Sequence, residues 1–151
     1  MTDSIEKRIL LKAPRSRVWK AISDKEEFGT WFGVSLGSGT FTAGESTRGH
    51  MTIRGYEHLR WTAEIVEVKP EERLSYRWHP YAVDPDVDYS SEPQTLVTFT
   101  LEDAPEGTLL TIVESGFDAL PLHRRDEAFR MNERGWTGQM KNIERHVTAT
   151  Q

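Results

Sequence analysis

Cysteine is absent from the 151 residues of this chain. Disulfide bridges, thiolate metal sites and cysteine nucleophiles are therefore excluded. No apolar run approaches the roughly 18 residues that a membrane-spanning helix needs, and the N-terminus lacks the apolar core of a signal peptide. These absences lead us to expect a soluble, cytoplasmic protein without a membrane partner.

Positive charge is in the minority, since 19 Lys and Arg stand against 24 Asp and Glu and the net charge is -5 at pH 7. This balance disfavours non-specific binding to nucleic acids or to anionic membranes, because both attract basic surfaces. We therefore expect no nucleic-acid partner. The length suits one domain spanning residues 1–151, which is large enough to bury a hydrophobic core.

Motifs that cradle phosphate or expose a nucleophile are also missing. The segment Gly33–Gly49 is rich in glycine but contains neither G-x-x-x-x-G-K-[ST] nor G-x-G-x-x-G. We interpret it as a turn-rich passage between short strands. Ser115-Gly116 does not belong to a G-x-S-x-G nucleophile elbow, so the sequence offers no ready catalytic set.

Metal-binding patterns are incomplete. The run Asp84-x-Asp86-x-Asp88 resembles the start of a calcium loop, but an EF-hand needs Gly at its sixth position and Glu at its twelfth. Those two positions hold Tyr89 and Thr95. The histidines show no H-E-x-x-H or comparable spacing. We expect neither a metal nor an organic cofactor.

The last part of the chain predicts a long amphipathic helix from about His123 to Thr148. Its apolar residues recur at steps of seven, four, three and four, which places them on one face of a 3.6-residue period. These residues are Phe129, Trp136, Met140, Ile143 and Val147. Such a stripe must be buried against another element for the helix to be stable.

Polar and small residues interrupt this stripe. Asn132 and Glu133 fall on the apolar side, and Gly135 and Gly138 follow in mid-helix, where each costs about 1 kcal/mol relative to alanine. We interpret the glycines as points where another element approaches closely. The helix is then either an ordinary core helix or a lid over a cavity.

Upstream of this helix, the sequence predicts one strand and two short helices. The strand covers Ser4–Lys12, and a short helix follows over Arg15–Ile22. Asp24 and Glu27 have capping-box spacing, so a second short helix should start at Asp24 and end near Trp31-Phe32.

The middle of the chain predicts an antiparallel meander. Apolar and polar residues alternate within each candidate strand, which is typical of a sheet covered on one face only. The expected strands are Thr47–Arg54, Arg60–Val68, Arg73–His79, Gln94–Leu101 and Thr108–Ser115. The connection Pro80–Pro93 is too long for a tight hairpin, and loops of that length are often functional.

Glu114 is the most informative polar residue in the predicted sheet. It continues the apolar series of Leu110 and Ile112, so it either faces the covered side or ends the strand in solvent. A carboxylate on the covered side needs hydrogen-bond donors, a cation, water or a proton. Trp78 and Trp136 are ambiguous in a similar way, because each can be packed core or a cavity wall.

Several segments together resemble the activators of heat-shock-protein ATPase, a family within the START-like and birch-pollen-allergen-like superfamily. The segments are Ala13-Pro14-x3-Val18-Trp19-x-Ala21-Ile22, Trp31-Phe32, Glu64-Ile65-x3-Lys69-Pro70-x2-Arg73-Leu74-x3-Trp78, Gly107-Thr108-x-Leu110-x-Ile112 and Gly135-Trp136-x3-Met140-x2-Ile143. They follow one another in the family's order along nearly the whole chain.

The resemblance implies an α+β helix-grip fold. In this fold a curved antiparallel sheet of six or seven strands wraps around the C-terminal helix, and two short helices follow the first strand. It also implies an apolar cavity between sheet and helix, and a homodimer is possible. The family has no shared catalytic residues to carry over, so the fold does not decide the function.

The leading hypothesis is binding of a small apolar or amphipathic molecule in that cavity. The alternatives are a cyclase or hydrolase that uses Glu114 or a cavity histidine as acid or base, and an interaction module that stimulates a heat-shock chaperone ATPase. We expect the cavity to be rimmed by the segments Gly33–Gly49 and Pro80–Pro93. The expected ligand-binding residues are Trp31, Tyr76, Trp78, Phe99, Glu114, Phe129 and Trp136.

Overall fold

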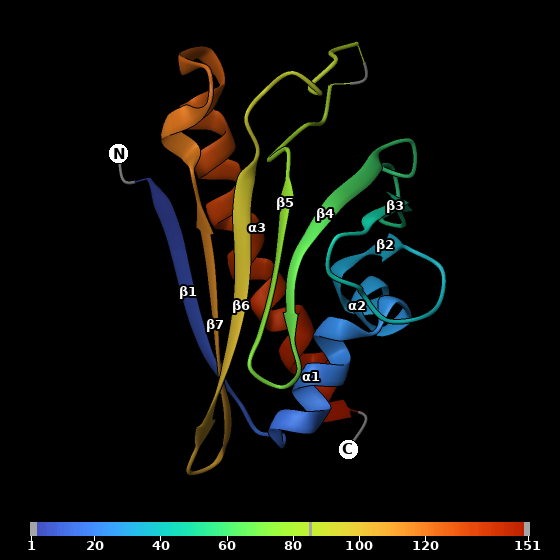
Figure 1. Cartoon of the computed structure of the whole chain (residues 1–151), viewed down its shortest axis with the longest axis vertical. Helices are drawn as coiled ribbons and strands as arrows, with labels where there is room; N and C mark the ends of the chain where they lie inside the picture. Colours follow the sequence, from blue (N-terminus) through green and yellow to red (C-terminus); the bar gives the residue numbers. More distant parts are fainter. Residues whose placement is uncertain (1–2, 85, 150–151) are drawn as a thin grey trace.

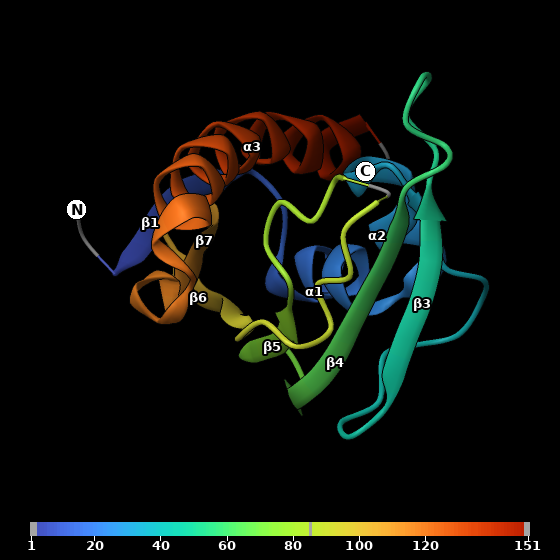
Figure 2. The same cartoon turned by 90° about the horizontal axis from the view of Figure 1, so that it is seen from above.

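A curved antiparallel sheet grips one long helix in the computed structural model, which describes residues 3–84 and 86–149 (Figures 1 and 2). Within those residues the sheet has seven strands in the order β1-β7-β6-β5-β4-β3-β2. In chain order the elements are β1 (Ser4–Leu11), α1 (Arg15–Ser23), α2 (Lys25–Phe32), β2 (Val34–Ser35), β3 (Ser46–Met51), β4 (Arg60–Lys69), β5 (Arg73–Trp78), β6 (Thr95–Ala104), β7 (Gly107–Ser115), the 3-10 helix η1 (Phe117–Ala119) and α3 (Leu122–Ala149). The predicted α+β helix-grip fold is confirmed.

The core lies between the concave face of the sheet and the apolar stripe of α3. On β6 and β7 every second side chain is buried, as the alternation of the sequence predicts. On α3 the buried residues are Ala128, Trp136, Met140, Ile143 and Val147. Phe129 is only partly buried and packs edge-on against Phe117, with ring centroids 5.1 Å apart.

The two short helices begin and end as their sequences require. The Asp24 side chain accepts a hydrogen bond from the backbone N–H of Glu27 at 3.0 Å, which confirms the predicted cap at the start of α2. Gly33 ends α2 with φ of 94°, a left-handed conformation that glycine adopts without strain. Figure 1 shows α1 at the end of the molecule opposite the long connection between β5 and β6.

Two segments differ from the prediction. Part of the expected turn-rich passage Gly33–Gly49 forms β2, a two-residue strand that pairs with Met51 and His50 of β3. The expected strand ends at Leu101 and Thr108 are also wrong, because the ladder between β6 and β7 continues until Ala104 pairs with Gly107. A two-residue strand and the last pairs of a hairpin carry too little periodicity to be recognised in a sequence.

The prediction that Gly135 and Gly138 mark close approaches to another element is wrong. A Cβ atom added at either position would meet no heavy atom within 4 Å. Both glycines lie on the exposed side of α3, so packing does not require them. Gly29 of α2 is the true close approach, since a Cβ there would lie 2.1 Å from the backbone oxygen of Val34.

The connection between β5 and β6 lies across the open end of the space between α3 and the β4 side of the sheet (Figure 2). It contains the acidic run; Pro85, which interrupts that run, lies outside the described residues. Among the residues that the structure describes, no group of three or more His, Asp or Glu side chains is arranged to hold a metal ion. None of the helices in the described ranges is long and apolar enough to cross a membrane.

The glycine geometry predicts opposite outcomes for two helical substitutions. Gly138→Ala should stabilise the protein by about 1 kcal/mol, because the methyl group enters open space and alanine favours helix. This corresponds to a rise in Tm of about 2–4 °C for a chain of this size. Gly29→Ala should lower the Tm, because its methyl group collides with backbone. Thermal unfolding followed by circular dichroism checks both, and equal shifts would contradict the packing described here.

Candidate functional site

A pocket of about 330 Å³ opens where the sheet splays apart. The last residue pair between β4 and β5 is Glu64 with Arg77, whereas β4 stays paired with β3 as far as Arg60. The start of β4 therefore runs on without β5 beside it. The gap is bordered by residues 59–62 on one side and, on the other, by Trp78 at the end of β5 and residues 79 and 81–83 of the connection that follows.

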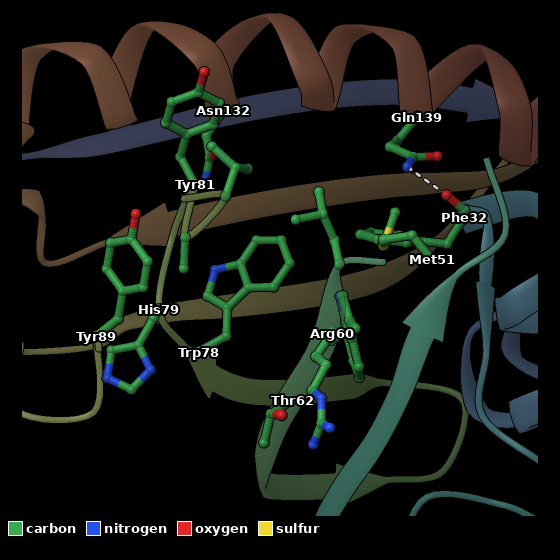
Figure 3. A pocket seen from close by; sticks show the side chains of 14 residues that line it. Phe32, Met51, Arg60, Thr62, Trp78, His79, Tyr81, Tyr89, Asn132 and Gln139 are labelled. Atoms are coloured by element: carbon green, nitrogen blue, oxygen red, sulfur yellow. Dashed lines mark hydrogen bonds between the residues drawn. The ribbon is translucent and has the colours of Figure 1, made fainter. Parts of the chain in front are cut away.

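The walls of this pocket are mainly aromatic. Trp78 lies at its centre, with Tyr81 and Tyr89 from the following connection on one side (Figure 3). Phe32 and Trp61 bound it as well, and their ring centroids lie 6.2 and 6.1 Å from that of Trp78. Broad apolar walls with few polar groups are typical of sites for small organic molecules.

A smaller hollow of about 70 Å³ continues from the pocket towards α3. It shares Phe32, Trp78 and two residues of α3, Asn132 and Gln139, with the larger pocket. Gly135 also lines the hollow, and its missing side chain leaves that space open. Gly135, which the packing of α3 does not require, therefore leaves space at the site.

A basic groove adjoins the aromatic pocket on the outer face of the sheet. Arg60 and Thr62 line both spaces, and Arg48, His50 and His58 line only the groove. His50 of β3 pairs directly with Arg60 of β4. Glu57 lines the groove as well, so two arginines and one carboxylate carry its charge at pH 7.

Glu114 lies beneath the pocket, fully buried, and its carboxylate is surrounded by donors. Oε2 accepts hydrogen bonds from the indole N–H of Trp78 at 2.7 Å and from the hydroxyl of Thr95 at 2.5 Å. Oε1 accepts from the indole N–H of Trp136 at 2.8 Å. The amide nitrogen of Asn132 lies 2.9 Å from Oε1 and 3.1 Å from Oε2. Because indole and amide N–H groups only donate, this arrangement suits the ionised carboxylate.

The charge on Glu114 is held by neutral dipoles. Among the described residues no Lys, Arg or His forms an ion pair with it. Burial, and next the nearby charge of Glu114, raise the pKa of the Tyr76 hydroxyl well above its ordinary value. That hydroxyl is buried without a hydrogen-bond partner in the described structure, so it stays protonated and adds no second charge.

A single arginine fastens the connection between β5 and β6 to the start of α3. Arg124 donates from Nε to Glu92 Oε1 at 2.9 Å, from Nη1 to the backbone oxygen of Tyr81 at 3.0 Å and from Nη2 to that of Pro80 at 3.0 Å. Its guanidinium also lies 4.6 Å from the centroid of the Tyr89 ring. We call this set of contacts the Arg124 latch. It holds both ends of the segment that covers the pocket.

The latch fixes an unusual backbone conformation. Tyr81 has φ of 49°, in the left-handed region that residues other than glycine rarely occupy. Its carbonyl is one of the two that Arg124 holds, and its ring borders the pocket. His79 beside it has Nε2 at 3.1 Å from the backbone oxygen of Glu92, and since a carbonyl only accepts, that nitrogen carries the proton.

The seven residues expected to bind ligand do not all reach the open space. Trp78 lines the pocket and Trp136 lines the smaller hollow. Glu114 lies behind both tryptophans, bonded to their indole groups. Phe129 packs on Phe117 at another part of the core. The remaining residues, Trp31, Tyr76 and Phe99, are buried in the hydrophobic core.

Aromatic packing explains why the pocket lies at the end of the space between sheet and helix. Phe28 stacks on Phe32 at 5.0 Å and meets Phe99 edge-on at 6.4 Å, so rings fill the space between sheet and helix. Trp31 is fixed in this core by a hydrogen bond from its indole N–H to the carbonyl oxygen of Ala21 at 2.8 Å. The pocket around Trp78 lies beyond this cluster.

Several residues of the site were not anticipated from the sequence, namely Phe32, Tyr81, Tyr89, Arg124 and Gln139. The available signal was two tyrosines within an otherwise polar, acidic connection. Asn132 was noticed only as an interruption of the apolar stripe.

Comparison with known structures supports the fold. Protein MLL2253 from Mesorhizobium loti is 21% identical and superposes with a TM-score of 0.76 over 98% of both chains. A solution structure from Arthrobacter aurescens is 17% identical, with a TM-score of 0.79 over 97% of this chain and 87% of that one. DynU16, from the dynemicin biosynthetic locus, is 24% identical with a TM-score of 0.75, and this chain spans 49% of its length.

No curated protein matches the sequence. The model of one protein family does, under the description "Activator of Hsp90 ATPase homolog 1-like protein", and the match covers residues 12–148. Since this is nearly the whole chain, and the observed fold is the one expected from the resemblance, the chain belongs to the family of Activator of Hsp90 ATPase homolog 1-like proteins.

Proposed function

We propose that the protein binds a small apolar or amphipathic molecule in the aromatic pocket around Trp78. The observation that carries the proposal is a pocket of about 330 Å³ bordered by Phe32, Trp61, Trp78, Tyr81 and Tyr89. Its volume lies in the range of small-molecule sites, roughly 300–1,000 Å³. A preformed cavity saves a ligand the free energy of rearranging the core.

Polar groups at the rim suit an amphipathic ligand in particular. The apolar part would lie against Trp78 and Tyr81, while a polar or anionic group could reach Arg60 at the border of the basic groove. The connection held by the Arg124 latch would then cover the ligand. Of the seven residues expected from the sequence to bind the ligand, this proposal keeps Trp78 and Trp136 as contact residues. Glu114 lies behind them.

The enzyme alternative receives less support from the geometry. A general acid or base must come within hydrogen-bond reach of the reacting group. Both oxygens of Glu114 are occupied by protein donors, and Glu114 is not among the residues that line the pocket. Among the described residues that line the pocket there is no Asp or Glu that could replace it, and the pocket histidine, His79, has its Nε2 engaged with the backbone oxygen of Glu92.

The chaperone alternative would be favoured by a broad exposed apolar patch. The large exposed apolar side chains in the described part of the chain are spread over β1, the β3–β4 connection, β4, the β5–β6 connection and the start of α3, with no more than two on any of them. They are Leu10, Ile53, Tyr56, Val66, Val83, Val87 and Leu122. Ligand binding therefore remains the function that the site supports best.

A neutral fluorescent probe tests the proposal directly. We expect N-phenyl-1-naphthylamine to bind with one-to-one stoichiometry, to gain fluorescence and to quench tryptophan emission, because Trp78 lines the pocket. At a free concentration of 100 times its Kd the probe should stabilise the protein by about 2.7 kcal/mol. Fluorescence titration and thermal unfolding provide the measurements; absence of both effects would refute the proposal.

Filling the hollow should weaken probe binding. Gly135→Phe places a ring beside Trp78 and Trp136 without a backbone clash, and we expect the affinity to fall by about tenfold, or about 1.4 kcal/mol. Gly138→Phe is the matched control, because it adds the same side chain to the same helix at a glycine that does not line the pocket. Equal losses in the two variants would argue against binding at this site.

Releasing the latch should loosen the cover of the pocket. Arg124→Gln removes charge-assisted hydrogen bonds worth about 1.5–3 kcal/mol each. We expect faster hydrogen exchange of the amides between Tyr81 and Glu92 and faster dissociation of the probe, while amides of β6 and β7 keep their protection. Arg130→Gln, an exposed change further along α3, serves as the control. Unchanged exchange between Tyr81 and Glu92 would show that the latch does not hold the cover.

A further inference from the structure

The donors that border the hollow are already in use. The indole N–H groups of Trp78 and Trp136 both donate to Glu114. Gln139 donates from Nε2 to the backbone oxygen of Phe32 at 2.9 Å, and its Oε1 accepts from Asn142 at 3.0 Å. Each of these three side chains thus bonds to the protein, whereas the indole N–H of Trp61, in the larger pocket, has no partner in the described structure.

Asn132 is different, because only half of its amide is committed. Its Nδ2 lies between the two oxygens of Glu114, at 2.9 and 3.1 Å. The orientation of the amide follows from the partner, since a carboxylate only accepts and must face the NH2 group. The Oδ1 atom is left on the side away from Glu114, and the hydrogen bonds of Asn132 in the described structure all run from Nδ2.

This free acceptor belongs to the cavity. Asn132 lines both the aromatic pocket and the smaller hollow, as does Gln139 further along α3 (Figure 3). An acceptor in an apolar cavity favours a ligand that supplies a donor, because an unpaired polar group costs about 1–3 kcal/mol when it is shut off from water.

We infer that Asn132 makes the pocket selective for neutral aromatic molecules that carry a hydroxyl or N–H group, which donates to Asn132 Oδ1. Glu114 is the positioning residue in this arrangement, because its ionised carboxylate keeps the NH2 group of Asn132 turned away from the ligand. The inference rests on the proposed function and specifies the ligand class that the same site accepts.

The buried charge strengthens the selection. A ligand acceptor, such as an ether or carboxylate oxygen, would face Asn132 Oδ1 with Glu114 directly behind it. Reversing the amide to offer NH2 to such a ligand would turn Oδ1 towards the carboxylate, and both oxygens are acceptors. In a site of low dielectric constant that arrangement is repulsive. A site that pairs with a hydrogen-bond donor of its ligand rejects analogues without that donor strongly. A site that selects its ligand by size alone discriminates less.

Two probes that differ in one hydrogen-bond donor test the inference on the unmodified protein. 2-Naphthol and 2-methoxynaphthalene have the same ring system, but only the first can donate. We expect 2-naphthol to bind about tenfold more tightly, which corresponds to about 1.4 kcal/mol, although the ether is the more apolar molecule. Isothermal titration calorimetry, or displacement of N-phenyl-1-naphthylamine, gives both constants.

Variants assign the selectivity to named atoms. Asn132→Leu removes the acceptor, so the ratio of the two affinities should fall to about one, with binding of the ether retained. Glu114→Gln should reduce the ratio as well, because a neutral amide at position 114 can donate to Asn132 and allow it to turn. Lys141→Leu, an exposed change on the same helix, should keep the ratio of the unmodified protein.

The outcomes separate the two proposals. If neither probe binds, the proposed function fails and the donor selectivity fails with it. If both bind with equal affinity, or the ether binds more tightly, the selectivity is refuted and the proposed function stands. If Asn132→Leu or Glu114→Gln does not fold, as judged by thermal unfolding, the affinity ratio of the unmodified protein still decides.

Discussion

The structure depends on the burial of one carboxylate. Glu114 carries a full charge into the core, and a buried charge is tolerated only when its hydrogen-bond capacity is filled. Its donors come from three elements: Trp78 from β5, Thr95 from β6, and Asn132 with Trp136 from α3. Displacing the helix along the sheet would separate the carboxylate from its donors, so the network fixes the register of α3.

The same network shapes the pocket from behind. Because Trp78 and Trp136 are held through their indole N–H groups, they present ring faces and edges, not polar atoms, to the open space. The aromatic cluster around Phe28 and Phe32 fills the middle of the grip. The cavity is consequently displaced to the end of the sheet, where β4 runs beyond β5.

Much of the fold was accessible from the sequence, because period-two and period-3.6 patterns report directly which residues are buried. The alternation that ends in Glu114 left two positions open for this carboxylate, the covered face and solvent, and in the structure it lies on the covered face. Its partners were beyond reach, since Trp78 and Glu114 are 36 residues apart and only the sheet register brings them together. Nor could the sequence show that position 29 has no room for a side chain whereas position 138 has room for one. That distinction depends on what another element places nearby.

The Arg124 latch fixes the two ends of the connection that covers the pocket. Its anchor points are the carbonyls of Pro80 and Tyr81 at one end and the carboxylate of Glu92 at the other. Between them, Tyr89 also contacts Arg124 through its ring. If Tyr89 is kept, the rest of the segment between Tyr81 and Glu92 can change in sequence and length while its ends stay held, so this scaffold could be redirected to new ligands by exchanging that segment.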